Sequence, residues 1–486
     1  MFDEIRRETH ESVSPFVREE NITGCIGVRI AKVSRRWREK MAVKIKNMTE
    51  GKPSDIILTF ALSLMAGNIF QQLYTVVDTM VVGKVLGVGA LAALGAAEWM
   101  NWMMLGIIQG FTQGFGIMMA KAFGAGKHDA LRKAVAGSAV IAAVSALVLV
   151  AAGQLMAAPL LRVLQTPPDI WDGTILYLRI MFMGIPIVML YNLLACILRA
   201  LGDGRTPLNA MIVASVVNIL LDMLFVIGFG WGIAGAASAT LIAQLVSSIF
   251  CIWHIRKIEL LRMQPEDFRL SGRLAGELMY LGFPMAFQNA VIAVGGMIVQ
   301  AVVNGFGVVF IAGFTATNKL YGLLEIAATS YGYAMVTYMG QNMGAGKVRR
   351  IHDGMRAAVV IALITSVVIA ACMLGFGRFL LGLFISGSPE TVEATMEVAY
   401  HYLAVMSVCL PVLYILHVTR SAIQGMGNTV LPMLSGVAEF VMRTASALLL
   451  PRLIGENGIF YAEIMAWMGA DVILVISYFI VVRRLS

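Results

Sequence analysis

Charged residues are scarce in this sequence. Of its 486 residues only 14% are charged and 59% are hydrophobic, whereas a soluble globular domain typically has about 25% charged residues. Apolar runs of about 20 residues recur from Ile56 to the C-terminus, and each is long enough to cross a hydrocarbon core of about 30 Å as a helix. The composition excludes an ordinary soluble protein and predicts an all-α polytopic membrane protein.

Motifs for metal binding, catalysis and nucleotide binding are also missing. The five cysteines form no CxxC pair and no His/Cys metal spacing, and the six histidines belong to no catalytic set. The turns "FGAGK" (123–127) and "MGAGK" (343–347) lack the GxxxxGK spacing and the Ser or Thr that follows lysine in a phosphate loop. We therefore expect no enzyme, no cofactor and no ATP site. Any work must draw on an ion gradient. The cysteines are Cys25, Cys196, Cys251, Cys372 and Cys409.

The N-terminus has no apolar segment that would make it a signal peptide. Residues 1–50 are polar and of mixed charge, and we expect a disordered, basic cytoplasmic tail. Met41 or Met48 could equally be the true start, so the sequence leaves open whether residues 1–47 belong to the protein.

Twelve apolar segments are separated by glycine, proline and basic residues, and each is predicted to span the membrane. They lie near 56–83, 93–120, 134–157, 173–198, 208–229, 233–255, 277–303, 309–340, 355–378, 394–422, 430–452 and 458–482.

The net charge of +8 is concentrated in alternate loops rather than on a nucleic-acid-binding face. Lysines and arginines gather in residues 127–133, 199–205, 256–273, 347–356 and 483–484. The other loops hold only Lys84, Arg162, Arg378 and Arg452. Because cytoplasmic loops carry the excess of basic residues, both termini are predicted to face the cytoplasm.

The sequence repeats itself after about 220 residues. "FGAGK" matches "MGAGK", and "LRALGDGRTPL" (198–208) matches "SAIQGMGNTVLP" (421–432), in the same order and topology. An even number of helices separates the copies, which predicts a parallel repeat of two six-helix lobes around a central cavity. We expect an N-lobe at 51–256, a cytoplasmic linker at 257–276 and a C-lobe at 277–486.

Several polar residues interrupt the first, fifth and sixth spans. On the first span, Asn68, Gln71/Gln72, Thr75 and Asp78 recur at steps of three or four, and Ser215, Asn218 and Asp222 do so on the fifth. Counted from the predicted outer helix ends at 1.5 Å per residue, Asp78, Asp222 and Thr240 of the sixth span lie roughly 8, 9 and 12 Å deep. The matched depths predict one site made of Asp78, Asn218, Asp222 and Thr240.

This set of oxygen ligands suits a small cation such as Na⁺ or a proton shared by carboxylates. The chemistry leaves that choice open. At the repeat offset the second half has Gln300, Val441 and Ala445 in place of Asp78, Asn218 and Asp222, so the site is expected in the N-lobe alone. Other polar residues of the spans are candidates to line the substrate cleft: Asn68, Gln72, Thr75, Gln288, Gln300 and Glu325.

Together, the repeat, the two GAGK turns, "FQQLYTVVDTMVVGKVLG" (70–87) and "NILLDMLFVIGFGWGIAGAASAT" (218–240) resemble the multidrug and toxic compound extrusion (MATE) family over residues 48–486. The resemblance implies two six-helix lobes and alternating access that exports cationic or amphipathic drugs against Na⁺ or H⁺. In bacterial members with an ion site in the first lobe, the ligands match Asp78, Asn218, Asp222 and Thr240. Acids that other members use on spans seven and ten have no well-embedded counterpart here.

The sequence thus predicts a monomeric multidrug antiporter of the cell membrane, with drug-like cations and the lipid bilayer as its partners. A flippase for lipid-linked saccharides is the alternative. Such a protein should line its cleft with many basic residues to hold pyrophosphate, and the spans carry few.

Overall fold

The computed structural model describes residues 45–164, 166–385 and 388–484. From Ile45 onward they form one compact unit, whereas the greater part of the predicted tail lies outside these ranges. The long elements are helices: α3 (Pro53–Leu86), α4 (Val88–Gly124), α5 (His128–Val163), α6 (Pro168–Met183), α7 (Ile185–Ala200), α8 (Arg205–Asp222), α9 (Gly232–Ile255), α10 (Gly272–Val303), α11 (Val308–Gly344), α12 (Val348–Gly382), α13 (Pro389–Gly425), α14 (Val430–Ile454) and α15 (Phe460–Arg483).

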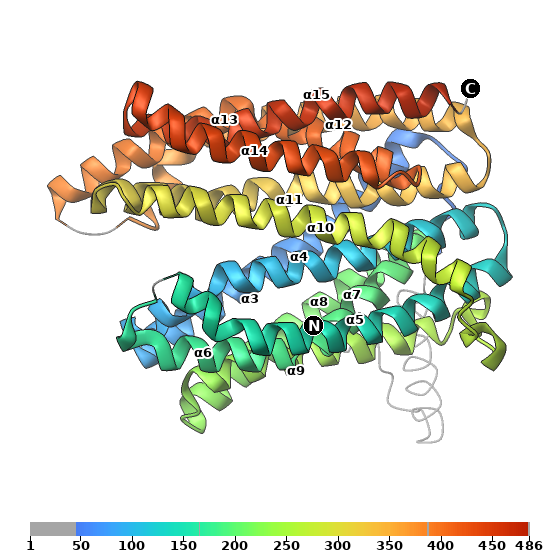
Figure 1. The fold of residues 1–486 in the computed structure, drawn as a ribbon, viewed down its shortest axis with the longest axis horizontal. Coiled ribbons are helices and arrows are strands. Elements are labelled where there is room, and N and C mark those ends of the chain that lie inside the picture. Colours follow the sequence, from blue (N-terminus) through green and yellow to red (C-terminus); the bar gives the residue numbers. More distant parts are fainter. Residues whose placement is uncertain (1–44, 165, 386–387, 485–486) are drawn as a thin grey trace, which may run out of the picture. The chain divides into compact units, whose positions relative to one another are not determined.

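The twelve predicted spans are confirmed within the described residues. By length and composition alone, ten helices can cross a membrane, and the bent pair α6–α7 makes an eleventh. The twelfth, α11, is 37 residues long and runs among the others (Figure 1). This helix contains Lys319 and Glu325.

The fourth span differs from the single helix predicted at 173–198. It breaks at Gly184, and its two parts, α6 and α7, are bent by 48°. Pro186 at the start of α7 lacks a backbone N–H and cannot extend the preceding helix. Gly184 lies so close to Leu241 of α9 that a Cβ atom there would overlap with it. The bend therefore follows from a proline next to a glycine that is packed against α9.

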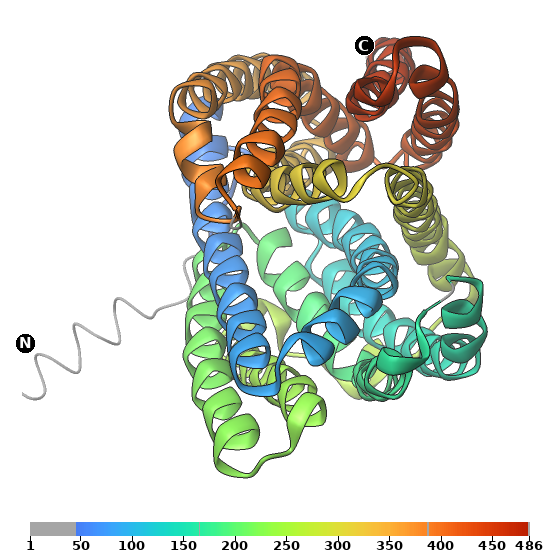
Figure 2. The ribbon, with the colours of Figure 1, turned by 90° about the vertical axis from the view of Figure 1, so that its left-hand side faces the viewer.

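We call α3–α9 the N-half and α10–α15 the C-half. Most helices pack mainly within their own half, whereas α4 and α10 pack most extensively on each other, and α3 and α4 also meet α11 between the halves. Figure 2 shows these four helices, drawn in blue and yellow, between the green helices of the N-half and the orange and red helices of the C-half.

The contact between the halves is closest along α4. Gly110 and Gly114 form a GxxxG motif that faces Ala286 and Gly282 of α10, and Cβ atoms at either glycine would overlap with the α10 backbone. Gly124 likewise faces the backbone of Gln341 in α11. These contacts lie towards one end of the bundle, which holds the turns after α4, α7, α9 and α11 and which we call the basic end.

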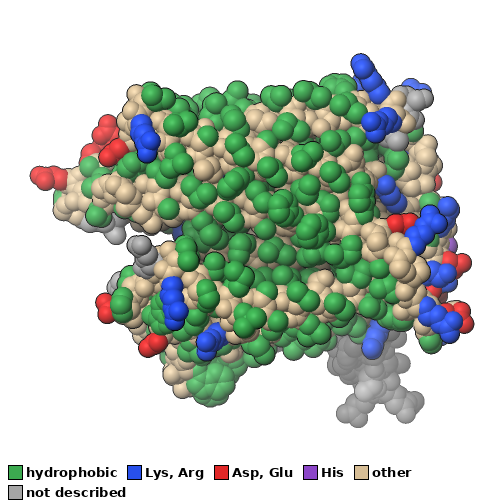
Figure 3. Space-filling view, in the orientation of Figure 1, with side chains coloured by type: hydrophobic (Ala, Val, Ile, Leu, Met, Phe, Trp, Pro, Cys, Tyr) green, Lys and Arg blue, Asp and Glu red, His purple; other side chains and the backbone are tan. Residues whose placement is uncertain are grey.

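At the other end the two halves separate. The space-filling view in Figure 3 is hollowed between them on the left, opposite the basic end. Its hydrophobic side chains cover the flanks of the helices, as a surface in contact with lipid requires.

The structure of one short segment differs from the one that the sequence predicts. Residues 46–50 were expected to belong to a disordered tail. In the structure Met48 is fully buried and Thr49 is 5% exposed, so these two residues pack against the helices.

The glycine contact gives a first prediction. Gly114→Leu should lower the midpoint of thermal unfolding in detergent by several degrees, because overpacking a tight contact costs about 1–3 kcal/mol. Gly95→Leu is the matched control on the same helix, since nothing lies within 4 Å of its Cβ position. Equal unfolding midpoints for the two variants would show that the α4–α10 contact is not tight.

Candidate ion-binding site

The polar side chains in the interior of the N-half begin with Asp78 of α3. It lies eight residues before the helix end at Leu86, or about 12 Å along the axis. Its side chain is 8% exposed, and its Oδ1 atom is buried without a hydrogen-bond partner. Burying an unpaired carboxylate is costly, and no side chain among the described residues offsets that cost at Oδ1.

The second group stands at the end of α8. Asn218 and Asp222, one helical turn apart, are fully buried, and both polar atoms of each side chain are unpartnered. Directly after Asp222 the helix changes to the π-helix η1 (Met223–Gly228). Such π segments are rare and frequently occur at functional sites.

The fold brings these two groups together. α3 packs against α8, η1 and α9, and α8 and η1 pack against α9. Asp222 lies within electrostatic range of Asp78. An apolar cluster of Val82, Val226 and Ala236 joins α3, η1 and α9 and keeps these helices in contact next to the acids.

Thr240 of α9, the fourth predicted ligand, is partly buried on a helix that packs against α3 and α8. One turn further along α9, the buried Oε1 of Gln244 has no hydrogen-bond partner. The buried side chain of Tyr74 interacts with both Gln244 and Asp78. Sequence reasoning missed Gln244, although its spacing of four residues from Thr240 was a usable signal.

The cleft candidates on α3 divide between two surroundings. Asn68 Nδ2 donates to Ser330 Oγ of α11 at 3.2 Å, and Gln72 faces Gly322 of the same helix. Thr75 is exposed, and its hydroxyl donates to Gln71 O within α3. The polar stripe on α3 therefore reaches the boundary between the halves with Asn68 and Gln72, while Asp78 points into the N-half.

The candidates in the C-half lie in separate places. Gln288 is 1% exposed and accepts a hydrogen bond from Gln424, so it belongs to the interior of the C-half. The side-chain amide of Gln300 donates to Asn304 one turn later on α10. Glu325 is partly buried on α11, and its carboxylate lies 3.7 Å from His417 Nε2.

Two acids of the C-half have arginine partners, whereas Oδ1 of Asp471 on α15 is buried without a hydrogen-bond partner. Arg443 Nη2 lies 3.0 Å from Glu439 and 2.6 Å from Glu463, and Arg420 Nη2 lies 2.5 Å from Glu439. The spacing of four residues between Glu439 and Arg443 on one helix predicts this pair from the sequence, and the structure confirms it. The acids of this network thus have arginine partners, whereas those on α3 and α8 have none.

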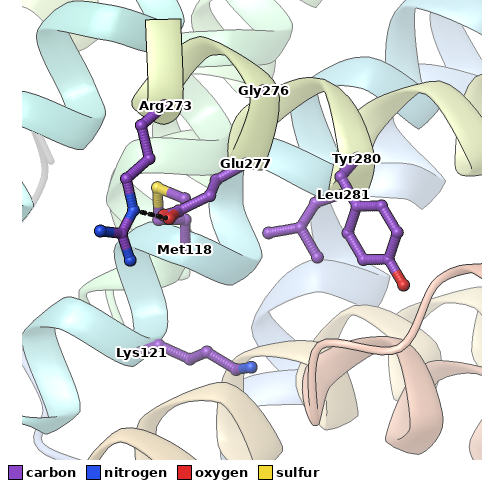
Figure 4. Close-up of a pocket in the computed structure, with 7 residues that line it drawn as sticks. All are labelled: Met118, Lys121, Arg273, Gly276, Glu277, Tyr280 and Leu281. Carbon is purple, nitrogen blue, oxygen red and sulfur yellow. Dashed lines mark hydrogen bonds and ion pairs between the residues drawn. The ribbon is translucent and has the colours of Figure 1, made fainter. Parts of the chain in front are cut away.

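A cavity of about 500 Å³ opens at the basic end between α4 and α10. Figure 4 shows Arg273 paired with Glu277 on one side of it and Lys121 reaching in from α4. Lys121 Nζ donates to Met426 O of the C-half at 2.9 Å. This cavity lies at the other end of α3 and α4 from the unpaired acids, so it is not part of the candidate ion site.

Comparison with known families agrees with this architecture. The family model described as MatE matches residues 64–224 and again residues 284–449. The chain belongs to the MatE family. The two matches lie about 220 residues apart and confirm the repeat, and a MatE protein is a transporter rather than an enzyme.

Similar proteins carry transport names. The chain is 27% identical over 418 residues to the "Probable multidrug resistance protein YpnP" of Bacillus subtilis, covering 86% of this chain and 93% of that protein. It is 22% identical to the "Multidrug export protein MepA" of Staphylococcus saprophyticus, covering 85% and 89% respectively. A MATE family transporter solved in an outward-facing conformation superposes with a TM-score of 0.85 at 20% identity, covering 92% of this chain and 99% of that one.

The arginine network of this MatE chain gives a second prediction. Arg443→Met should destabilise the protein by about 3–5 kcal/mol, because removing one partner of a buried ion pair leaves uncompensated charge. Thermal unfolding in detergent measures this loss. Arg452→Met, on the exposed last turn of the same helix, should unfold at the parent temperature. An equally stable Arg443→Met protein would contradict the structural role of the network.

Proposed function

We propose that the protein is a secondary active exporter of cationic or amphipathic small molecules, driven by Na⁺ or H⁺ that binds Asp78, Asn218, Asp222 and Thr240. The observation that carries this proposal is the pair of buried carboxylates on α3 and α8, which have no basic partner within the half that encloses them. The names of the similar proteins support the class of substrate, and the fold supports alternating access.

The donor set accounts for the choice of ions. Asp78 and Asp222 offer carboxylate oxygens, and Asn218 adds an amide oxygen on the same helix. Oxygen donors of this kind suit a small hard cation, and a buried carboxylate that takes up a proton becomes neutral. In either case Asp78 and Asp222 lose their mutual repulsion when the ion binds, so α3 and α8 can approach each other.

We assign the basic end to the cytoplasm on the excess of lysine and arginine in its turns. In this orientation both termini are cytoplasmic, and the protein lies in the cell membrane as a monomer. The close contacts of α4 then shut the cytoplasmic side, and the hollow between the halves faces outwards. Asp78 and Asp222 lie towards this outer side, where external ions can reach them and displace a bound drug.

The flippase alternative requires free basic groups in the cleft. Arg420 and Arg443 are held by Glu439 and Glu463, so they are not available for a pyrophosphate group. This pairing favours the drug exporter.

Efflux in cells tests the substrate class and the site together. In bacteria lacking their major efflux pumps, the protein should export ethidium, and Asp78→Asn and Asp222→Asn should each lower the initial efflux rate at least tenfold. Asp172→Asn, an exposed acid on α6, should stay within twofold of the parent. If both site variants, present at equal levels in the membrane, export ethidium at the parental rate, the proposed ion site is wrong.

A reconstituted system tests the coupling. In proteoliposomes, a Na⁺ gradient and an H⁺ gradient are imposed in separate experiments. One of the two should raise substrate export at least fivefold, and Asp222→Asn should abolish that rise. The gradient that works identifies the ion. Transport that ignores both gradients would show that the protein is not an antiporter.

A further inference from the structure

A short segment before α3, Lys46–Gly51, lies between the two halves at the basic end. We call it the strap. The backbone N–H of Lys46 donates to Leu201 O in the turn after α7 at 3.2 Å. Its carbonyl lies against Gly202, which has a φ of +77° and no room for a Cβ atom. The strap therefore begins in close backbone contact with the N-half.

The following residues of the strap are bound by the C-half. The N–H of Met48 donates to Gln341 Oε1 at 2.8 Å, and Met48 O accepts from Arg350 at 3.1 Å and Asn342 at 3.3 Å. Arg350 also donates to Gly51 O at 2.8 Å. The ammonium group of Lys347 donates to the carbonyl and hydroxyl oxygens of Thr49 at 2.9 and 3.1 Å.

The partners of the strap also join the halves directly. Gln341 and Asn342 are fully buried, and Gln341 Nε2 donates to Ala200 O of α7 at 2.8 Å. The side chain of Met48 enters an apolar cluster that contains Phe60 of α3 and Tyr338 of α11. The basic end is thus closed by a polar contact. The strap and α7 contribute mainly backbone groups to it, and α11 and α12 of the C-half contribute side chains.

We propose that the strap is a lock which holds the two halves closed at the basic end and must leave Gln341, Lys347 and Arg350 each time that end opens. This proposal rests on the alternating-access function given above. It extends that function to residues that contact neither the drug nor the ion. Because the strap continues directly into α3, it is joined by one unbroken helix to Asp78 in the N-half.

The chemistry of the lock suits repeated opening. At the end of the bundle the released carbonyl, amide and guanidinium groups can exchange these bonds for bonds to water, so each bond contributes only a modest net stability. Several such bonds together can bias the population of the closed state strongly, and losing one side chain should shift that population measurably.

The first test removes one partner of the strap. Arg350→Met deletes the bonds to Met48 and Gly51, together with the bond from Arg350 Nε to Asn342 Oδ1 of α11, and keeps an unbranched side chain. Arg349→Met is the matched control, because it removes the same positive charge from an exposed position on the same helix. Thr337 is 4% exposed and lines a small cavity between α4, α7 and α11. In a background without the native cysteines, Thr337→Cys reports opening by its rate of reaction with a permeant maleimide.

The expected result is that Arg350→Met raises the labelling rate of Cys at position 337 at least tenfold, while Arg349→Met stays within twofold of the parent. Gln341→Met, which removes the contacts to Met48 and Ala200, should raise it in the same direction. Size-exclusion profiles confirm that each variant is folded. Labelling of folded Arg350→Met at the parental rate would overturn the proposal.

The second test holds the strap in place. In the variant with both Thr49→Cys and Lys347→Cys, a short bifunctional thiol reagent joins the two cysteines. This cross-link should reduce the labelling rate at position 337 at least tenfold and stop export. Each single-cysteine variant treated with the same reagent should keep its labelling rate and its export. If the cross-linked protein still exports, the strap does not leave the C-half and the proposal is wrong. The labelling readout needs no drug or ion gradient, so failure of the lock and failure of the proposed drug export can be told apart.

Discussion

The backbone contact of α4 with α10 and α11 is the constraint on which the arrangement of the halves depends. Within a bilayer, helices gain little from burying apolar surface against one another, so close packing at small residues decides which helices associate. Gly110, Gly114 and Gly124 bring the α4 backbone closest to the C-half towards the basic end, and Glu98 near the start of α4 pairs with Lys319 of α11 at 3.0 Å. The halves consequently approach each other most closely towards the basic end, and the strap lies there.

The two halves share an architecture but differ in how several of their buried acids are balanced. In the C-half, Glu439 and Glu463 are neutralised by Arg420 and Arg443, so that charge balance is permanent. In the N-half, Asp78 and Asp222 lack such partners, and this is the observation on which the proposed Na⁺ or H⁺ site rests. The two copies of a duplicated fold can thus differ in which of their buried acids have arginine partners.

Much of this could be predicted from residue patterns, because a bilayer imposes simple rules. Twelve apolar segments, a repeat of about 220 residues and polar residues at helical spacing were sufficient to predict the helices and to select Asp78, Asn218 and Asp222. The break at Gly184, the partner of Glu325 and the role of Gln244 were missed. Each of these depends on a neighbour from another helix, namely Leu241, His417 and Tyr74, and spacing along one helix does not reveal such a neighbour.

The sequence by itself determined the membrane class, the number of spans and the residues that break the apolar pattern, since hydropathy and periodicity are local properties of the chain. Only the tertiary structure decided which of those polar residues have partners. Asp78 and Arg443 both look like charges in an apolar helix, yet the first is left without a partner and the second holds two carboxylates. The strap is the clearest case, because Met48–Gly51 reads as the end of a polar tail and becomes buried only when α11 and α12 supply Gln341, Lys347 and Arg350.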